Sequence, residues 1–257
     1  MSQRGLHFNN RHGLALSARL DAPPDGAAVA YAIFAHCFTC GKDIKAAYHI
    51  AHALNREGIG VLRFDFTGLG ASQGDFADTN FSSNVADLID AAHYMKSQAM
   101  PPQILIGHSL GGAAVIQAAP SIPEVRAVVV IAAPSDPGHL TRHLERIREP
   151  LQQQGEADIT IGERTLTIKR QFLDDITQSD IDRDLKNLDR ALLILHSPRD
   201  SVVDIDNAAR LYRTAQHPKS FVSLDTADHL LSDPEDARYA GALIAAWVRR
   251  YLPKDTP

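Results

Sequence analysis

The segment Gly107-His108-Ser109-Leu110-Gly111 carries the spacing Gly-x-Ser-x-Gly. An apolar run ending at Ile106 precedes it, and small and apolar residues follow from Gly112. A sharp turn between a strand and a helix presents such a serine as a nucleophile, with the positive end of the helix behind it. The glycines suit that turn because side chains there would clash with the neighbouring elements. This context favours Ser109 as a nucleophile over an incidental serine in a glycine-rich turn.

A serine hydroxyl needs a base to take its proton, and in this arrangement an acid and then a histidine follow the serine along the chain. His229 lies just after the apolar run Ser220–Leu224 and before the last helical segment, which is the expected loop. His217 precedes that run, and His196 ends an earlier strand, where a packed or hydrogen-bonded histidine is expected. We therefore predict His229 as the base.

The acid is expected in the loop that follows the strand Ala191–Leu195. Asp200 fits best because Val202 and Val203 then lead into the next helix, and Asp204 is the alternative. Asp204 and Asp206 are otherwise expected to cap that helix. The acid would hold the tautomer of His229 and stabilise its cation without taking the proton itself.

A tetrahedral intermediate needs two donors for its oxyanion. One is predicted to be the backbone N–H of Leu110, directly after the nucleophile. The other should come from the loop His36–Gly41, where Phe38 and Cys37 are the candidates. The glycine-rich run Asp65–Ser72 fits either a wall of the same pocket or a plain turn.

Cys37 and Cys40 spell C-x-x-C, so a redox-active pair is an alternative to a simple role in this loop. Two cysteines are too few for a disulfide framework, and a reducing cytoplasm is the default. Zinc would need more ligands than these two and His36. His139 and His143 lack the glutamate of a zinc-protease motif and are expected to face solvent or a partner. We therefore expect neither a metal nor an organic cofactor.

The elements that must position these residues alternate between strand and helix, which argues for a parallel, doubly wound α/β sheet. Leu14–Leu20 alternates apolar and polar residues and is expected to be an antiparallel edge strand. The other expected strands are Val29–Ala35, Gly60–Phe66, Gln103–Gly107, Val125–Ala132, Ala191–Leu195 and Ser220–Leu224. The expected helices are Ile44–Asn55, Asn80–Ser97, Leu110–Ala119, Ile205–Ala215 and Pro234–Tyr251.

The stretch 134–190 breaks this alternation and is interpreted as an inserted lid within a single domain of residues 1–257. It contains an amphipathic helix over Gly138–Gln153, a short hairpin over Asp158–Ile168 and the start of a helix at Arg170. It is too short to hold a core of its own.

The composition is that of an ordinary globular protein, with 44% hydrophobic and 22% charged residues. A net charge of −5 without a basic cluster argues against nucleic acid as a partner. The longest apolar runs fall far short of the roughly 20 residues of a membrane span. The N-terminus lacks the apolar core of a signal peptide, so a cytoplasmic location is expected.

Four runs together resemble one group of proteins, the α/β-hydrolases that occur alone or fused ahead of an OsmC-like peroxide-reducing domain. The runs are His36–Asp43, Phe64–Gly70, Gly74–Phe81 and Gly107–Gly112. Lys169–Asp175 and the loop from His196 through Asp200 are similar too. The resemblance covers nearly the whole chain. It implies an eight-stranded sheet with a small cap, and it puts Ser109, Asp200 and His229 at the triad positions.

Relatives of this fold often carry His-Gly-x in the first loop, and the third residue donates to the oxyanion. This alignment assigns that donor to Phe38, while Cys37 stands where glycine is usual and is the runner-up. Members of the group resemble small carboxylesterases. An OsmC-like partner is implied only by association.

These observations predict a cytoplasmic serine hydrolase that cleaves small carboxylic esters, with short acyl chains because a short lid suggests a modest pocket. A homodimer is a further expectation. Thioester or amide hydrolysis by the same triad is an alternative, because all three reactions pass through an oxyanion. A hydrolase-fold protein that binds a ligand or a redox partner without catalysis is the non-enzymatic alternative.

Overall fold

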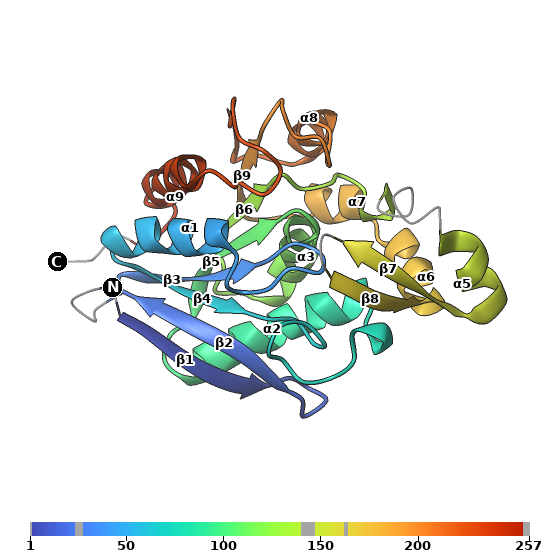
Figure 1. Cartoon of the computed structure of the whole chain (residues 1–257). Helices are drawn as coiled ribbons and strands as arrows, with labels where there is room; N and C mark the ends of the chain where they lie inside the picture. The colour runs from blue at the N-terminus through green and yellow to red at the C-terminus, as the bar shows by residue number, and fades with distance from the viewer. Residues whose placement is uncertain (1, 24–27, 140–146, 162–163, 254–257) are drawn as a thin grey trace.

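The computed structural model describes residues 2–23, 28–139, 147–161 and 164–253. Within these residues, eight strands form one sheet in the order β1-β2-β4-β3-β5-β6-β9-β10 (Figure 1). The two pairs that involve β2 are antiparallel, and the other neighbours in the sheet are parallel. The strands are β1 Ser2–Asn9, β2 Ala15–Ala22, β3 Ala30–Ala35, β4 Ile59–Phe64, β5 Pro102–His108, β6 Ala127–Ile131, β9 Ala191–His196 and β10 Lys219–Ser223. The mostly parallel, eight-stranded sheet expected from the sequence is confirmed.

Helices cover both faces of the sheet, and this accounts for the continuous apolar runs of the central strands. Every residue of β4, β6 and β9 is buried. One core cluster joins the sheet to α1 and α9, and a second cluster joins it to α2, α3 and α8. The helices are α1 Lys45–Arg56, α2 Phe81–Ser97, α3 Leu110–Ala118, α8 Asp206–Thr214 and α9 Pro234–Val248.

The edge of the sheet differs from the expectation. The strand expected at the edge corresponds to β2, which pairs with β1 on one side and with β4 on the other. The edge strand is β1, which the hydrophobic pattern does not indicate because Phe8 is its one buried residue. Its pairing with β2 runs from Ser2 opposite Ala22 to Asn9 opposite Ala15, so backbone hydrogen bonds define this strand.

The segment between β6 and β9 holds α5 Arg148–Gln154, β7 Glu156–Ile161, β8 Arg164–Lys169, α6 Arg170–Gln178 and α7 Ile181–Lys186. The predicted hairpin is confirmed as the antiparallel pair β7–β8, and the predicted helix at Arg170 is α6. The helix α7 was not expected. Much of the helix expected over Gly138–Gln153, His143 included, lies outside the described residues, as does the side chain of His139.

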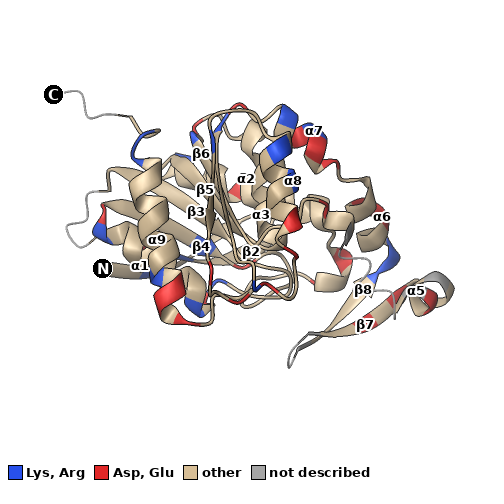
Figure 2. Cartoon of the chain, turned by 90° about the horizontal axis from the view of Figure 1, so that it is seen from above, with Lys and Arg blue, Asp and Glu red and all other residues tan. Residues whose placement is uncertain are grey.

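This inserted segment is attached to the rest of the fold through α6. Asp175 accepts hydrogen bonds from the N–H and the hydroxyl of Ser82, at the first turn of α2, both at 2.7 Å. A carboxylate there also complements the positive end of the helix. The buried ring of Phe172 joins the core on the same side. Figure 2 shows β7, β8 and α5 extending beyond the sheet.

Candidate active site

The turn from β5 into α3 holds Ser109 in an unusual backbone conformation. Its φ is 54° and its ψ is −125°, a region that non-glycine residues seldom adopt and that is characteristic of functional sites. The N–H of Ser109 donates to the carbonyl oxygen of Ile131 at 2.8 Å, which holds the turn against β6. The surrounding structure therefore fixes the strained serine at the carboxyl end of the parallel strands.

The two flanking glycines are required by close backbone contacts. A Cβ at Gly107 would lie 2.2 Å from the carbonyl oxygen of Gly111. A Cβ at Gly111 would lie 2.5 Å from the carbonyl oxygens of Ala35 and His36. Because Gly107 and Gly111 have no side chains, α3 can approach both β5 and the end of β3. That approach brings the start of α3 beside the loop His36–Gly41.

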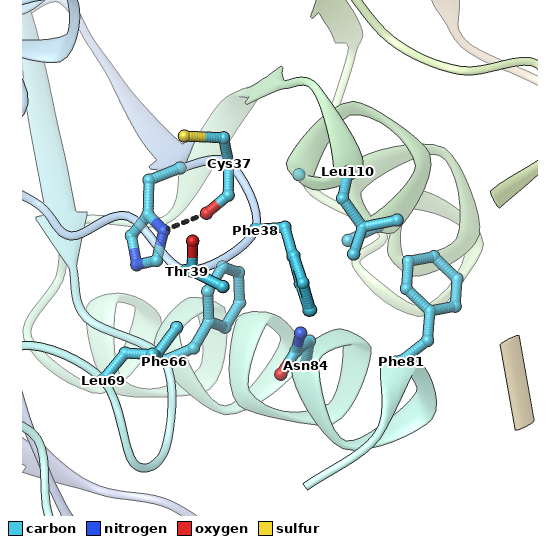
Figure 3. A pocket seen from close by; sticks show the side chains of 11 residues that line it. Cys37, Phe38, Thr39, Phe66, Leu69, Phe81, Asn84 and Leu110 are labelled. Atoms are coloured by element: carbon cyan, nitrogen blue, oxygen red, sulfur yellow. Dashed lines mark hydrogen bonds between the residues drawn. The ribbon is translucent and has the colours of Figure 1, made fainter. Parts of the chain in front are cut away.

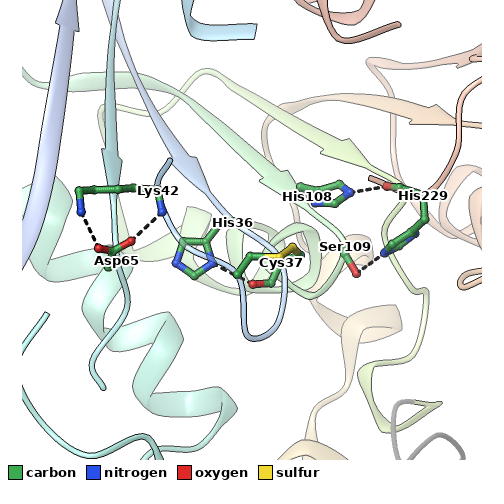
Figure 4. Close-up of a disulfide and its surroundings, with 8 residues drawn as sticks. His36, Cys37, Lys42, Asp65, His108, Ser109 and His229 are labelled. Atoms are coloured by element: carbon green, nitrogen blue, oxygen red, sulfur yellow. Dashed lines mark hydrogen bonds and ion pairs between the residues drawn. A yellow bond between two sulfur atoms is a disulfide. The ribbon is translucent and has the colours of Figure 1, made fainter. Parts of the chain in front are cut away.

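Ser109, His229 and Asp200 form one chain of hydrogen bonds. His229 Nε2 lies 3.1 Å from Ser109 Oγ, and His229 Nδ1 lies 2.8 Å from Asp200 Oδ2 (Figure 4 draws the first of these contacts). His229 is 8% exposed, and the side chain of Asp200 is fully buried. The three residues come from separate loops that follow the carboxyl ends of β5, β9 and β10. Such a chain can pass the serine proton to imidazole while a carboxylate balances the resulting charge.

Asp200 is held in its charged form by the groups around it. Burial alone would raise its pKa, but the hydrogen bond from His229 and those from the N–H groups of Val203 and Val202 outweigh it and lower the pKa. Both N–H groups donate to Oδ1 at 2.9 Å, which leaves Oδ2 for His229. Asp204 instead accepts a hydrogen bond from the N–H of Asp206, the first residue of α8, at 2.8 Å. The capping position of α8 is Ile205, so the prediction that Asp204 and Asp206 cap this helix is wrong.

The loop His36–Gly41 folds into a tight turn beside the start of α3. The N–H of Cys40 donates to the carbonyl oxygen of Cys37 at 3.2 Å, and the two cysteines form a disulfide. His36 Nδ1 donates to the same carbonyl oxygen at 2.8 Å. The sequence left a redox role of this pair open, but with a reducing cytoplasm as the default it did not predict the disulfide.

Leu110 and both oxyanion candidates from this loop, Phe38 and Cys37, line the same small cavity (Figure 3). The N–H of Leu110 is among the first N–H groups of α3, which have no acceptor within their own helix. Phe66 and Leu69 also line the cavity, which favours a pocket wall over a plain turn for the run Asp65–Ser72.

A buried carboxylate ties the far end of this loop to the glycine-rich run. Asp65 accepts from the N–H of Lys42 at 2.6 Å and from its Nζ at 2.6 Å. It also accepts from the N–H of Ala71 at 3.0 Å. Although burial opposes the charged form, these hydrogen bonds lower the pKa of Asp65. Asp65 therefore holds the two loops together as a charged group.

Three aromatic rings pack above the loop. The ring centroid of Phe38 lies 5.7 Å from that of Phe76 and 5.3 Å from that of Phe172. Phe172 belongs to α6, and Phe76 lies in the short helix η1, Phe76–Asp78. The inserted segment therefore contacts the loop directly through Phe172.

Two other buried histidines reach the same region and were not recognised as site residues from the sequence. The ring of His108 contacts His229, and His196 donates to a loop carbonyl, as expected for a hydrogen-bonded histidine. The position of His108 within the Gly-x-Ser-x-Gly segment was visible. The direction of its ring was not, because its partner lies 121 residues further along the chain.

Among the described residues, no cluster of three His, Cys, Asp or Glu side chains could hold a metal ion. Likewise, within the described part of the chain, no helix is long and apolar enough to cross a bilayer.

The profile of the Alpha/beta hydrolase family matches residues 32–255, and the chain belongs to this family. Among solved structures, the esterase domain from a Rhodothermus marinus protein is 47% identical and has a TM-score of 0.81. That match covers 98% of this chain and all of the other. Est1E from Butyrivibrio proteoclasticus, solved with ferulic acid, has a TM-score of 0.82 at 18% identity over 97% of this chain and all of its own, which shows the shared fold.

Among curated proteins, the mitochondrial palmitoyl-protein thioesterase ABHD10 of Mus musculus is 34% identical over 110 residues. The same protein of Rattus norvegicus is 32% identical over 105 residues. These matches cover 42% and 40% of this chain and 34% of each relative, so they span about a third of the relatives' length. The family match and the esterase structural neighbours together identify the chain as an α/β hydrolase.

Proposed function

We propose that this protein is a serine esterase that cleaves small carboxylic esters with Ser109, His229 and Asp200 as its catalytic triad. The observation that carries the proposal is the continuous contact from Ser109 Oγ through His229 to Asp200, at 3.1 and 2.8 Å. The strained backbone of Ser109 adds to it.

In the proposed reaction, His229 takes the proton of Ser109 as Oγ attacks the acyl carbon of the ester. Asp200 holds the ring and stabilises its positive charge. The N–H groups of Leu110 and Phe38 donate to the oxyanion of the tetrahedral intermediate, with Cys37 as the alternative to Phe38. His229 then protonates the leaving alcohol. In the second half of the reaction, His229 takes a proton from the water that attacks the acyl-enzyme, and it returns this proton to Ser109 Oγ as the carboxylic acid leaves.

The packing above the loop favours a short acyl chain. Phe38, Phe76 and Phe172 pack against one another where the loop His36–Gly41 meets α6, and we infer that they obstruct the path of a long acyl chain. We therefore propose that the segment 134–190 acts as a lid that limits the length of the acyl pocket.

The test is to measure kcat/KM for p-nitrophenyl acetate, butyrate and decanoate under one set of conditions. We expect kcat/KM to fall with chain length and Ser109→Ala to abolish turnover of all three esters. A preference for decanoate would contradict the short-chain proposal, and full activity of Ser109→Ala would contradict the mechanism.

A thioesterase is the second candidate, because the curated relatives carry the name palmitoyl-protein thioesterase. The same triad serves thioesters, and amides are a further alternative. Matched acyl groups on an oxygen, sulfur or nitrogen leaving group separate these reactions. A fluorophosphonate probe separates all of them from the non-catalytic binding alternative, which predicts no labelling of Ser109.

The cytoplasmic location, the homodimer and the OsmC-like partner stay predictions. Size measurement in solution tests the homodimer, and co-purification with an OsmC-like protein tests the partner.

A further inference from the structure

Two buried histidines stand at the ends of two strands that flank β6, directly behind the proposed triad. His108 is the last residue of β5 and His196 the last of β9, and they are 1% and 0% exposed. Neither ring is part of the proton path from Ser109 to Asp200. Burying a polar ring costs free energy unless the ring is hydrogen-bonded, so the partners of both histidines matter.

His108 holds the backbone of His229. Its Nε2 lies 2.7 Å from the carbonyl oxygen of His229 (Figure 4), and the two ring centroids are 5.2 Å apart. A carbonyl oxygen only accepts, so Nε2 of His108 carries the hydrogen. The other ring nitrogen, Nδ1, has no partner among the described residues. One directed hydrogen bond therefore links the strand before Ser109 to the base that serves it.

His196 makes the matching contact on the acid. Its Nε2 donates to the carbonyl oxygen of Val203 at 2.8 Å, and the N–H of Val203 donates to Asp200 Oδ1 at 2.9 Å. The same Nε2 lies 3.5 Å from Asp200 Oδ2. His196 thus holds Val203, and the N–H of Val203 in turn helps to orient the carboxylate of Asp200 towards His229.

Both rings are kept neutral by their surroundings. Burial, followed by the proximity of His229, lowers the pKa of His108 to about 4 despite the nearby Asp200. Burial also lowers the pKa of His196, against the hydrogen bond to Val203 and the charge of Asp200. Because both rings are neutral, they do not repel the positive charge that His229 gains in the reaction.

We propose that His108 and His196 are positioning residues, which act through His229 and Asp200 by holding the two loops of the triad in register. This inference rests on the serine-esterase function proposed above. A displacement of about 1 Å at a reacting group can cost on the order of 100-fold in rate, so the effect is expected in kcat.

The test compares two amide substitutions at each position. Glutamine places its amide nitrogen near the position of Nε2 and can still donate, whereas asparagine is one methylene shorter and leaves the carbonyl oxygen without its donor. We expect His108→Asn and His196→Asn to lower kcat by about 10- to 100-fold with little change in KM. His108→Gln and His196→Gln should recover most of that loss.

Val128→Ala, in the middle of the buried strand β6, is the matched control for a general loss of stability. It should lower the melting temperature and leave kcat unchanged. The inference is overturned if the folded asparagine variants keep the kcat of the wild type. It is equally overturned if a folded glutamine variant is no more active than its asparagine counterpart, or if Val128→Ala loses kcat in proportion to stability.

Labelling by a fluorophosphonate keeps the two proposals apart. If the wild type neither hydrolyses esters nor labels at Ser109, the proposed function fails. If the wild type labels and turns over while all four histidine variants match it, the positioning role alone is wrong.

Discussion

The substitution Asp200→Asn examines the part of the site that orients the base. In the wild type, Oδ1 accepts from the N–H groups of Val202 and Val203, and Oδ2 faces His229 Nδ1 at 2.8 Å. An asparagine has one oxygen, which those two N–H groups retain. Its NH₂ group then takes the place of Oδ2 and donates to Nδ1.

That donation forces the hydrogen of His229 onto Nε2, which points at Ser109 Oγ from 3.1 Å. A ring in this tautomer cannot accept the serine proton. The same change in a serine protease triad lowers kcat about 10⁴-fold, so we expect a loss of that order here. The loss corresponds to about 5 kcal/mol of transition-state stabilisation.

The assay is hydrolysis of p-nitrophenyl butyrate at neutral pH, with cooperative thermal unfolding as the check on folding. Asp204→Asn is the matched control, because Asp204 lies in the same loop and accepts a hydrogen bond from the N–H of Asp206 at the start of α8. It should cost about 1 kcal/mol or less in stability and keep its activity. A kcat within about tenfold of the wild type for a folded Asp200→Asn variant would refute the reasoning. So would a larger loss for Asp204→Asn.

Four further predictions follow from the same structure. Gly111→Ala places a Cβ 2.5 Å from two carbonyl oxygens, so it should yield inactive and poorly folded protein, as circular dichroism would reveal. Phe172→Ala opens space beside the proposed acyl pocket and should raise the ratio of decanoate to acetate hydrolysis, at a stability cost of about 3–5 kcal/mol. Reduction of the Cys37–Cys40 disulfide by dithiothreitol should lower kcat by loosening the proposed oxyanion loop. In the double variant Cys37→Ser/Cys40→Ser, kcat should not change on addition of dithiothreitol. The pKa of His108 falls from 6.5 in the unfolded chain to about 4 in the folded protein, so the unfolded chain binds more protons between these two pH values. The contribution of His108 to the free energy of unfolding should therefore be fully present above pH 6.5 and decrease by roughly 3 kcal/mol towards pH 4. Thermal unfolding of His108→Gln at the same pH values should lack this decrease.

The sheet could be predicted from the sequence wherever both of its faces are covered. Strands such as β6 consist of apolar residues alone, and the alternation with helices leaves few other arrangements. The strand β1 escaped prediction because seven of its eight residues are not buried. No local pattern reports a strand that is defined by hydrogen bonds to a neighbour.

The order of serine, acid and histidine along the chain restricts each triad candidate to one loop, and the structure brings the three side chains into hydrogen-bond contact. Ring direction was not predictable, so the contacts of His108 and His196 came only with the structure. The pairing of Cys37 with Cys40 was not predicted, for a related reason. A spacing of two intervening residues permits a disulfide, free thiols or a metal site, and the path of the backbone decides among them.

The most direct test of the central claim is mass spectrometry of the protein quenched during turnover of p-nitrophenyl butyrate. We predict a butyryl adduct on the peptide that contains Ser109, present in the wild type, strongly reduced in His229→Ala and absent from Ser109→Ala. Turnover with no adduct at Ser109, or an adduct on another residue that persists in Ser109→Ala, would contradict the account.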